Sequence, residues 1–394
     1  MKKTFLFCVA LCAMVLFSAC SSDKDEPKVS PISQKTVFNT AKNLTLTYNG
    51  QAMPDKQVIF TPDATDPSKA TLQLEGYADI ASLSKSTQIL PSSGPGIIPG
   101  SPSFSLPVDL TVNGSECSFA GSSNNEYCTF KYSGKASADK MELNISEVTL
   151  KNTALAGTTW TPAPLNATYT QEPVHIVWES SELVDIFGTG IGTMPIADVL
   201  KLAVRMPIIP FKIGDEEKVS VDEMLCYTFK SVTFGADGNI SATYIDAANG
   251  GTAEVTSPAN VAQYVITGDN TMKVYIDPVL VIKAIKESQK SKAGSNINVD
   301  LKEIMQLFSN GFDLNYQLNG GKLSVYLGTE TLLPLLKQLS SFLDDDMINM
   351  LIEAMKNNDS MKEYAGMVGG ILKSLPKIID TTTRVELGMN FIKK

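Results

Sequence analysis

Residues 316–327 read YQLNGGKLSVYL, and residues 264–276 read YVITGDNTMKVYI. Each stretch holds two short runs in which apolar and polar residues alternate, separated by a break rich in Gly and Asn. Alternation with a period of two is typical of half-buried strands, and a break of this composition is typical of a β-turn. We therefore predict two antiparallel hairpins, and the Val-Tyr pair that both contain indicates a topological repeat.

Amphipathic helices follow these hairpins. Apolar residues at helical spacing cover Pro278–Lys290 after the first hairpin and Thr331–Leu343 after the second. An earlier hairpin joins Tyr227–Phe234 to Ile240–Ile245 across Asp237-Gly238. Three hairpins, two of them followed by helices, predict an α+β domain over residues 174–394, an antiparallel sheet with amphipathic helices on one face.

The preceding residues, 37–151, predict an all-β domain, built as either a barrel or a sandwich. Asn43–Tyr48 and Met141–Leu150 alternate as strands do, and no helical period appears between them. Within the second run the apolar phase changes between Ile145 and Val148, which predicts a β-bulge. Residues 152–173, with three prolines, are the predicted linker.

The N-terminus has the pattern of an export signal. Lys2-Lys3 precede an apolar run, Phe5–Phe17, that is too short to span a bilayer. The segment Leu16–Cys20 resembles the lipobox of bacterial lipoproteins. This resemblance implies that residues 1–19 are a signal peptide, that Cys20 is lipidated and that residues 20–36 form a flexible tether. An ordinary signal peptide with an incidental cysteine is the alternative.

The chain also resembles a wider group of exported proteins. The acidic cluster Asp23–Glu26 resembles the surface-export signal of Bacteroidetes lipoproteins. With Leu44–Gly50 and Tyr132-Ser133-Gly134, the two-part body resembles Bacteroidetes exported lipoproteins of unknown function that carry a lipocalin-like N-terminal β domain. The resemblance implies an outer-membrane lipoprotein at the cell surface, with a periplasm-facing location as the alternative. It carries over no site residue except Cys20.

Two cysteines are candidates for a disulfide. Cys117 and Cys128 flank a turn-rich stretch, and a hairpin centred between Ser122 and Ser123 would place them directly opposite each other. That distance suits a disulfide, and an exported protein matures in an oxidising compartment. We predict a Cys117–Cys128 bridge, with two reduced strand cysteines as the alternative.

One long loop contains an apolar tip. Twelve of the fifteen residues in Pro91–Ser105 are Pro, Gly or Ser, and Ile97-Ile98 interrupt them. Loops of this length are usually functional or disordered. The segment is either a disordered or structural connection, or a lid or contact loop that presents Ile97 and Ile98.

The sequence contains no recognisable catalytic or metal-binding motif. His175 is the single histidine, and a hydrogen-bonded strand histidine explains it better than a general base. No Cys–His spacing suits zinc, and no glycine-rich nucleotide motif appears. Asp344–Asp346 are better explained as the start of a helix than as a calcium site. We predict no enzyme, no cofactor and no metal.

Composition narrows the choice of partner. The formal net charge is -9, whereas nucleic-acid binding needs clustered Lys and Arg, so no nucleic-acid partner is expected. We predict non-catalytic binding of a glycan, a lipid or another small molecule. The alternative is a structural or assembly subunit of an outer-membrane complex, which exposed apolar patches on the helices would favour.

Overall fold

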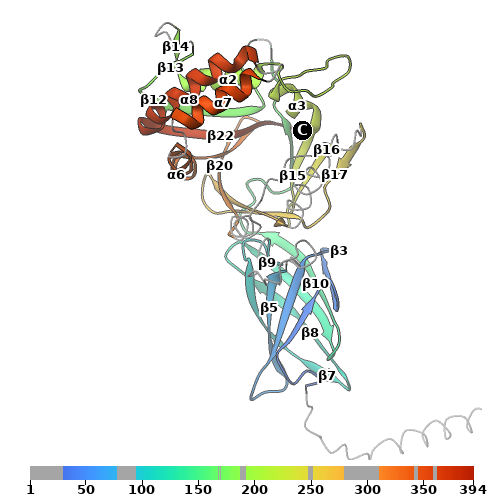
Figure 1. Cartoon of the computed structure of the whole chain (residues 1–394). Coiled ribbons are helices and arrows are strands. Elements are labelled where there is room, and N and C mark those ends of the chain that lie inside the picture. The colour runs from blue at the N-terminus through green and yellow to red at the C-terminus, as the bar shows by residue number, and fades with distance from the viewer. Residues whose placement is uncertain are drawn as a thin grey trace, which may run out of the picture.

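The computed structural model describes residues 30–77, 95–166, 168, 170–186, 192–246, 252–278, 310–340, 345–357 and 362–394. These residues form two lobes joined end to end (Figure 1). The predicted signal peptide, Cys20 and most of the tether lie outside the described residues, as does nearly all of the predicted helix Pro278–Lys290.

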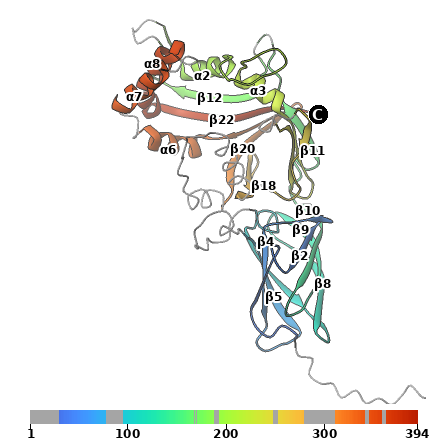
Figure 2. The ribbon, with the colours of Figure 1, turned by 45° about the vertical axis from the view of Figure 1, so that its right-hand side comes forward.

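The N-terminal lobe contains two sheets that face each other (Figure 2). Four strands form one sheet, in the order β1 (Thr36–Asn39), β4 (Lys56–Pro62), β5 (Lys69–Gly76) and β6 (Ser103–Asp109). Six form the other, in the order β3 (Gln51–Ala52), β2 (Leu44–Tyr48), β10 (Met141–Leu150), β9 (Cys128–Ala136), β8 (Glu116–Asn124) and β7 (Thr111–Asn113). No closed barrel forms among the described strands, so the barrel alternative is wrong for this lobe.

The predicted bulge in β10 is confirmed. Met141, Leu143 and Ile145 are buried, and after the bulge Val148 and Leu150 are buried instead. The register against β9 shifts between Ser146 and Thr149, and the intervening Glu147 takes a positive φ of 50°. The extra residue restores the apolar side chains to the core after the phase change.

The second lobe contains a larger antiparallel sheet than the three hairpins alone predict. Its order is β17 (Glu254–Thr256), β16 (Ile240–Ile245), β15 (Phe229–Phe234), β11 (Thr158–Pro162), β22 (Thr382–Lys393), β21 (Lys322–Leu327), β20 (Phe312–Asn319), β19 (Thr271–Ile276) and β18 (Ala262–Ile266), and β12 (Val174–Ser180) also pairs with β22. The predicted linker 152–173 is therefore not only a connection. It supplies β11 to the middle of the sheet, where Trp160 is buried.

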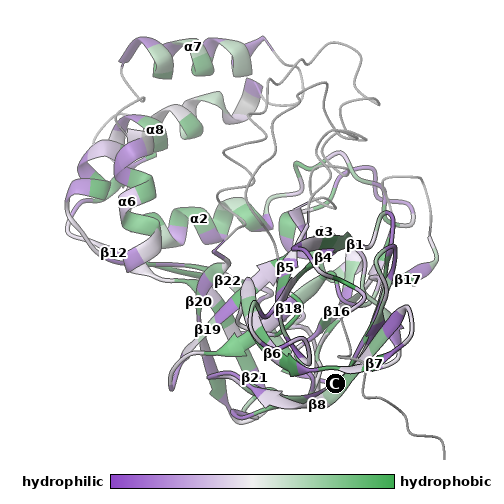
Figure 3. Ribbon diagram, turned by 90° about the horizontal axis from the view of Figure 1, so that it is seen from below, coloured by the Kyte–Doolittle hydropathy of each residue, from purple (hydrophilic) through white to green (hydrophobic). Residues whose placement is uncertain are grey.

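The helices belong to the second lobe. They are α2 (Ile196–Arg205), α3 (Val221–Thr228), α6 (Thr329–Ser340), α7 (Asp345–Lys356) and α8 (Ala365–Asp380), with a short 3-10 turn η2 (Lys362–Tyr364) and the small hairpin β13 (Val184–Asp185) and β14 (Thr193–Met194). Viewed along the long axis, α2, α6, α7 and α8 lie to one side of the N-terminal lobe and carry both hydrophobic and hydrophilic residues (Figure 3). A capping box between Ser220 and Glu223 starts α3.

The two lobes meet at the turn between β15 and β16. The Tyr48 hydroxyl of the first lobe donates to the Asp237 carbonyl, and the Leu150 amide donates to the Ala236 carbonyl. The Tyr264 hydroxyl of the second lobe donates to the neighbouring Gly235 carbonyl. One continuous core runs through both lobes and includes Tyr48, Tyr264 and Phe391, so the lobes share buried surface and not only a linker.

Candidate functional site

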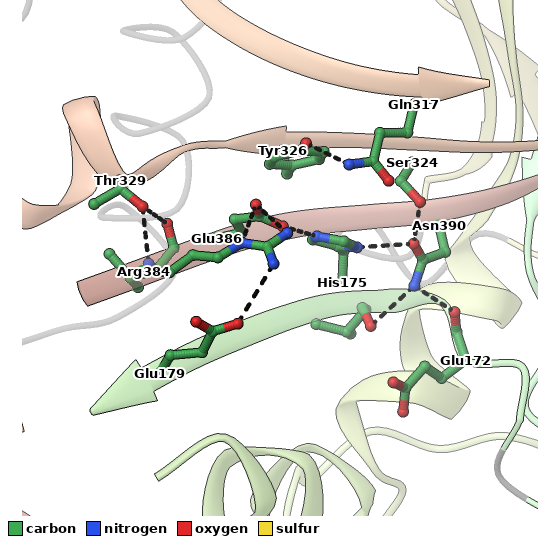
Figure 4. Close-up of polar contacts among 12 residues, drawn as sticks. Glu172, His175, Glu179, Gln317, Ser324, Tyr326, Thr329, Arg384, Glu386 and Asn390 are labelled. Carbon is green, nitrogen blue, oxygen red and sulfur yellow. Dashed lines mark hydrogen bonds and ion pairs between the residues drawn. The ribbon is translucent and has the colours of Figure 1, made fainter. Parts of the chain in front are cut away.

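Polar side chains gather on one face of strands β12, β22 and β21. Directly opposed residues of antiparallel strands point to the same face. The register pairs His175 with Gly388 and Gly388 with Tyr326, and it pairs Asn390 with Ser324. This polar face contains His175, Glu179, Ser324, Tyr326, Arg384, Glu386 and Asn390 (Figure 4).

A glycine at the middle of this face brings two rings together. His175 and Tyr326 stack with 4.6 Å between ring centroids and 20° between ring planes, although β22 runs between their strands. Two strands that are separated by a third strand lie about 10 Å from each other in a sheet. The rings can lean toward each other because Gly388 carries no side chain. A Cβ there would overlap the Val325 carbonyl and the Tyr326 side chain.

Both ring nitrogens of His175 have partners. Nε2 lies 2.9 Å from Glu386 Oε2, and Nδ1 lies 3.2 Å from Asn390 Oδ1. The other Glu386 oxygen accepts from Arg384 Nε at 2.8 Å. The prediction of a hydrogen-bonded strand histidine is therefore confirmed. Burial raises the pKa of Tyr326, and the Glu386 charge adds to that rise.

Asn390 ties the connection from β11 to β12 onto β22. Its Nδ2 donates to the carbonyls of Glu172 at 3.1 Å and Val174 at 3.3 Å. Its backbone amide donates to the Pro173 carbonyl, and its backbone carbonyl accepts from the Ala163 amide. Both ends of the connection, near Ala163 and near Pro173, are thus hydrogen-bonded to Asn390.

A pocket of about 200 Å³ opens between this connection and the paired strands β21 and β22. Its lining mixes hydroxyl, amide, charged and aliphatic groups from Ala163, Thr170, Gln171, Glu172, Lys322, Leu323, Ser324, Asn390, Phe391 and Ile392. The Ser324 hydroxyl donates to Asn390 Oδ1 at 2.7 Å, so the pocket and the histidine network share a residue.

An ion cluster lies beside the pocket, where α2 and α3 meet the start of β12. The Glu172 carboxylate bonds to Arg205 and lies 3.5 Å from Lys201 Nζ. Arg205 Nε is 3.9 Å from Asp222 Oδ2, which is too long for a hydrogen bond. Burial raises the pKa of Asp222 to about 6, against the opposing charge of Arg205. Neither Asp222 oxygen has a hydrogen-bond partner in the described part of the chain.

The apolar tip of the long loop lies inside the molecule. Ile97 and Ile98 are fully buried. The Asn125 amide holds the loop by donating to the Pro99 carbonyl at 2.7 Å, and Pro99 also approaches Gly238 at the turn between β15 and β16. The two isoleucines therefore pack within the chain. Of the two alternatives for this loop, a lid or contact loop that presents Ile97 and Ile98 is wrong, and a structural connection agrees with their burial.

The predicted Cys117–Cys128 disulfide is also wrong. Both cysteines are free, and Cys117 lies opposite Ala136. The centre of the β8–β9 turn falls between Glu126 and Tyr127, four residues beyond the expected centre, because Asn125 Oδ1 accepts from the Tyr127 and Cys128 amides. Cys128 lies opposite Asn125, so the two sulfurs are separated by eight residues, or about 26 Å, along the strands.

Sequence reasoning found His175 but missed the residues that surround it. The apolar phase of the last strand indicates only that it is a strand, and it consists of Val385, Leu387, Met389 and Phe391. The signal lay in the other phase, Arg384, Glu386, Gly388 and Asn390, where charged and amide residues alternate with those apolar ones. A glycine within such a strand often marks a close approach, and here it does.

Comparison with known proteins identifies no relative. No family model, no curated protein and no solved structure matches the chain. Within the described ranges, no helix is long and apolar enough to cross a membrane. The same residues contain no group of three or more His, Cys, Asp or Glu side chains placed to hold a metal ion.

Proposed function

We propose that this chain is an outer-membrane lipoprotein anchored through Cys20, and that its second lobe binds a polar ligand without catalysing a reaction. The observation that carries the proposal is the pocket beside Asn390, where hydroxyl, amide and charged groups surround about 200 Å³. Drug-sized ligands need pockets of roughly 300–1,000 Å³. The pocket therefore suits one small group, such as a terminal sugar residue of a glycan.

The position of the N-terminal end of the described chain supports this proposal. The described part of the chain begins at the end of the first lobe farthest from the second (Figure 1). An anchor that precedes it would leave the first lobe next to the membrane and hold the second lobe away from it. The pocket, which lies in the second lobe, would then be held away from the membrane surface.

The chemistry of the polar face favours binding over catalysis. A general base needs a ring nitrogen within reach of the substrate proton. Both nitrogens of His175 are bonded to Glu386 and Asn390, and the second Glu386 oxygen is bonded to Arg384. Because these four side chains are hydrogen-bonded to one another, a substrate would have to break those bonds before His175 or Glu386 could exchange a proton with it.

Two surface variants test where the ligand binds. Protein without the anchor is applied to an array of defined neutral and acidic oligosaccharides. Thr170→Trp places a bulky ring at the mouth of the pocket from an exposed position, and we expect binding to weaken at least tenfold. Ser133→Trp is the matched control, because Ser133 lines a separate groove of about 470 Å³ on the first lobe.

Each outcome of that experiment is informative. Loss of binding with Thr170→Trp alone supports the pocket, and loss with Ser133→Trp alone places the site on the first lobe. Native mass spectrometry before and after solvent extraction adds a further outcome. A co-purifying lipid that extraction removes would mean an apolar ligand and would contradict the polar pocket.

The alternative, an assembly subunit, is favoured by one observation. Helices α6 and α7 expose large apolar side chains, with Leu335 55% and Met350 59% accessible, and Met347 and Leu351 are also exposed. Such a patch is typical of a protein–protein contact. Leu335→Glu combined with Met350→Glu should release co-isolated envelope proteins if the chain is a subunit, and should change nothing in oligosaccharide binding.

A further inference from the structure

The orientation of the Asn390 amide fixes what its oxygen can accept. Its Nδ2 faces the carbonyls of Glu172 and Val174, which are acceptors only, so the nitrogen must lie on that side. Its Oδ1 therefore faces Ser324 Oγ and His175 Nδ1. An amide oxygen accepts and does not donate, so Nδ1 of the ring must carry a hydrogen.

The other ring nitrogen faces a carboxylate. Glu386 Oε2 lies 2.9 Å from Nε2, and Glu386 Oε1 already accepts from Arg384. An ionised carboxylate only accepts hydrogen bonds. A bare Nε2 would put a lone pair against that oxygen, so a proton has to lie between the two atoms. Glu386 also forms an ion pair with Arg384 at 2.8 Å, so the carboxylate is the anion of this network and the proton between the two atoms lies on the ring.

We infer that both ring nitrogens of His175 carry protons in the folded chain, and that His175 is a positioning residue for the pocket beside Asn390. The pocket part of this inference rests on the proposed function. Stacking on Tyr326 at 4.6 Å places the charged ring against an aromatic face, an arrangement that favours a cation. The ring is largely shielded, with a side-chain exposure of 14%.

The charges around the ring come from several elements. They are Glu172 and Glu179 at the two ends of β12, Arg384 and Glu386 on β22, the Tyr326 hydroxyl on β21, and Glu330 on α6, which acts on Tyr326. Of these groups Glu386 bonds directly to the ring, whereas Glu172 is paired with Arg205 and Lys201, and Glu179 is paired with Arg384.

The doubly protonated ring has a structural consequence for the pocket. If Nδ1 lost its hydrogen, Asn390 Oδ1 would face a lone pair, and the amide would have to rotate. Rotation would turn Nδ2 away from the Glu172 and Val174 carbonyls and remove two of the hydrogen bonds that hold the connection at the pocket wall. His175 thus holds the wall through Asn390, without needing to touch the ligand.

The single histidine makes the protonation state directly measurable. A long-range proton–nitrogen spectrum of uniformly ¹⁵N-labelled protein at pH 7.5 contains the signals of His175 alone. We expect two protonated ring nitrogens in the folded chain and a mixture of neutral tautomers in denaturant. One bare nitrogen in the folded spectrum at pH 7.5 would overturn the inference. This spectrum needs no ligand, so failure of the proposed function leaves it unaffected.

Two variants separate ring charge from positioning. Glu386→Gln replaces the accepting carboxylate oxygen with an amide nitrogen that donates to Nε2, so the ring should become neutral with its hydrogen on Nδ1, and Asn390 should stay in place. His175→Phe keeps the stack on Tyr326 but removes the donor to Asn390. In that variant we expect the Asn390 and Ala163 amides to exchange with solvent about tenfold faster. Unchanged exchange in His175→Phe would refute the positioning role, and equal acceleration in both variants would refute it as well.

Discussion

Replacement of Asp222 by asparagine should stabilise the protein at neutral pH. The Asp222 side chain is fully buried, and neither oxygen has a hydrogen-bond partner among the described residues. Burial raises its pKa from 3.8 to about 6. A shift of one pKa unit corresponds to about 1.4 kcal/mol, so the ionised carboxylate costs the folded state on the order of 3 kcal/mol. Asparagine has nearly the same shape and carries no charge.

The sign of the pH dependence follows from the direction of the shift. Below pH 3.8 the carboxyl is protonated in both states and costs nothing. As the pH rises from 3.8 to about 6, the unfolded chain ionises first, so the folded state loses stability relative to it. Above that window the full cost is present. The advantage of Asp222→Asn should therefore be largest at pH 7.5 and should shrink as the pH falls toward 4.

Urea unfolding of both proteins at pH 7.5 and pH 4.5 measures this advantage. Asp198→Asn is the matched control, because Asp198 lies in the first turn of the neighbouring helix α2 but is exposed. We expect no more than about 0.5 kcal/mol from the control. An unfolding midpoint of Asp222→Asn at or below wild type at pH 7.5, or an advantage equal at both pH values, would refute the reasoning.

Three further expectations follow from packing. Gly388→Ala should cost about 1–3 kcal/mol in urea unfolding, because its Cβ would overlap Val325 and Tyr326. Gly366→Ala is the control and should be neutral or stabilising, because Gly366 is an exposed position of helix α8 with no atom near the added Cβ. Ile98→Ala should cost about 2–5 kcal/mol and make the chain easier to cleave between its lobes in limited proteolysis, since Ile98 is fully buried. Protein purified in air should have the mass of the reduced chain. A thiol reagent should label Cys117 and Cys128 only after unfolding, because both side chains are buried. A deficit of two mass units would instead restore the bridge.

Much of the fold could be predicted from local pattern. The hairpin at 316–327 and the bulge before Val148 both appear where the alternation of apolar and polar residues places them. Local pattern failed at the linker, because β11 is a short strand that ends at Pro162 and is soon followed by Pro164. Its strand structure depends on pairing with β15 and β22, which are distant in the sequence.

The candidate site was less accessible to prediction. His175 is conspicuous as the only histidine, but its partners Glu386 and Asn390 are 211 and 215 residues away in the chain. Charged and amide residues on the last strand could equally face solvent. Only the register of β12 against β22 brings them to the ring.

The sequence by itself determined the alternation of strands and turns, the order of the elements and the export signal that the proposed function rests on, because these depend on neighbours within a few residues. The tertiary structure alone decided that Ile97 and Ile98 are buried, that Cys117 and Cys128 are far apart, and that Gly388 lets His175 reach Tyr326. Each of these depends on strand register or on packing between lobes. A register set by one turn residue moves every opposed pair along both strands, and no local pattern records that choice.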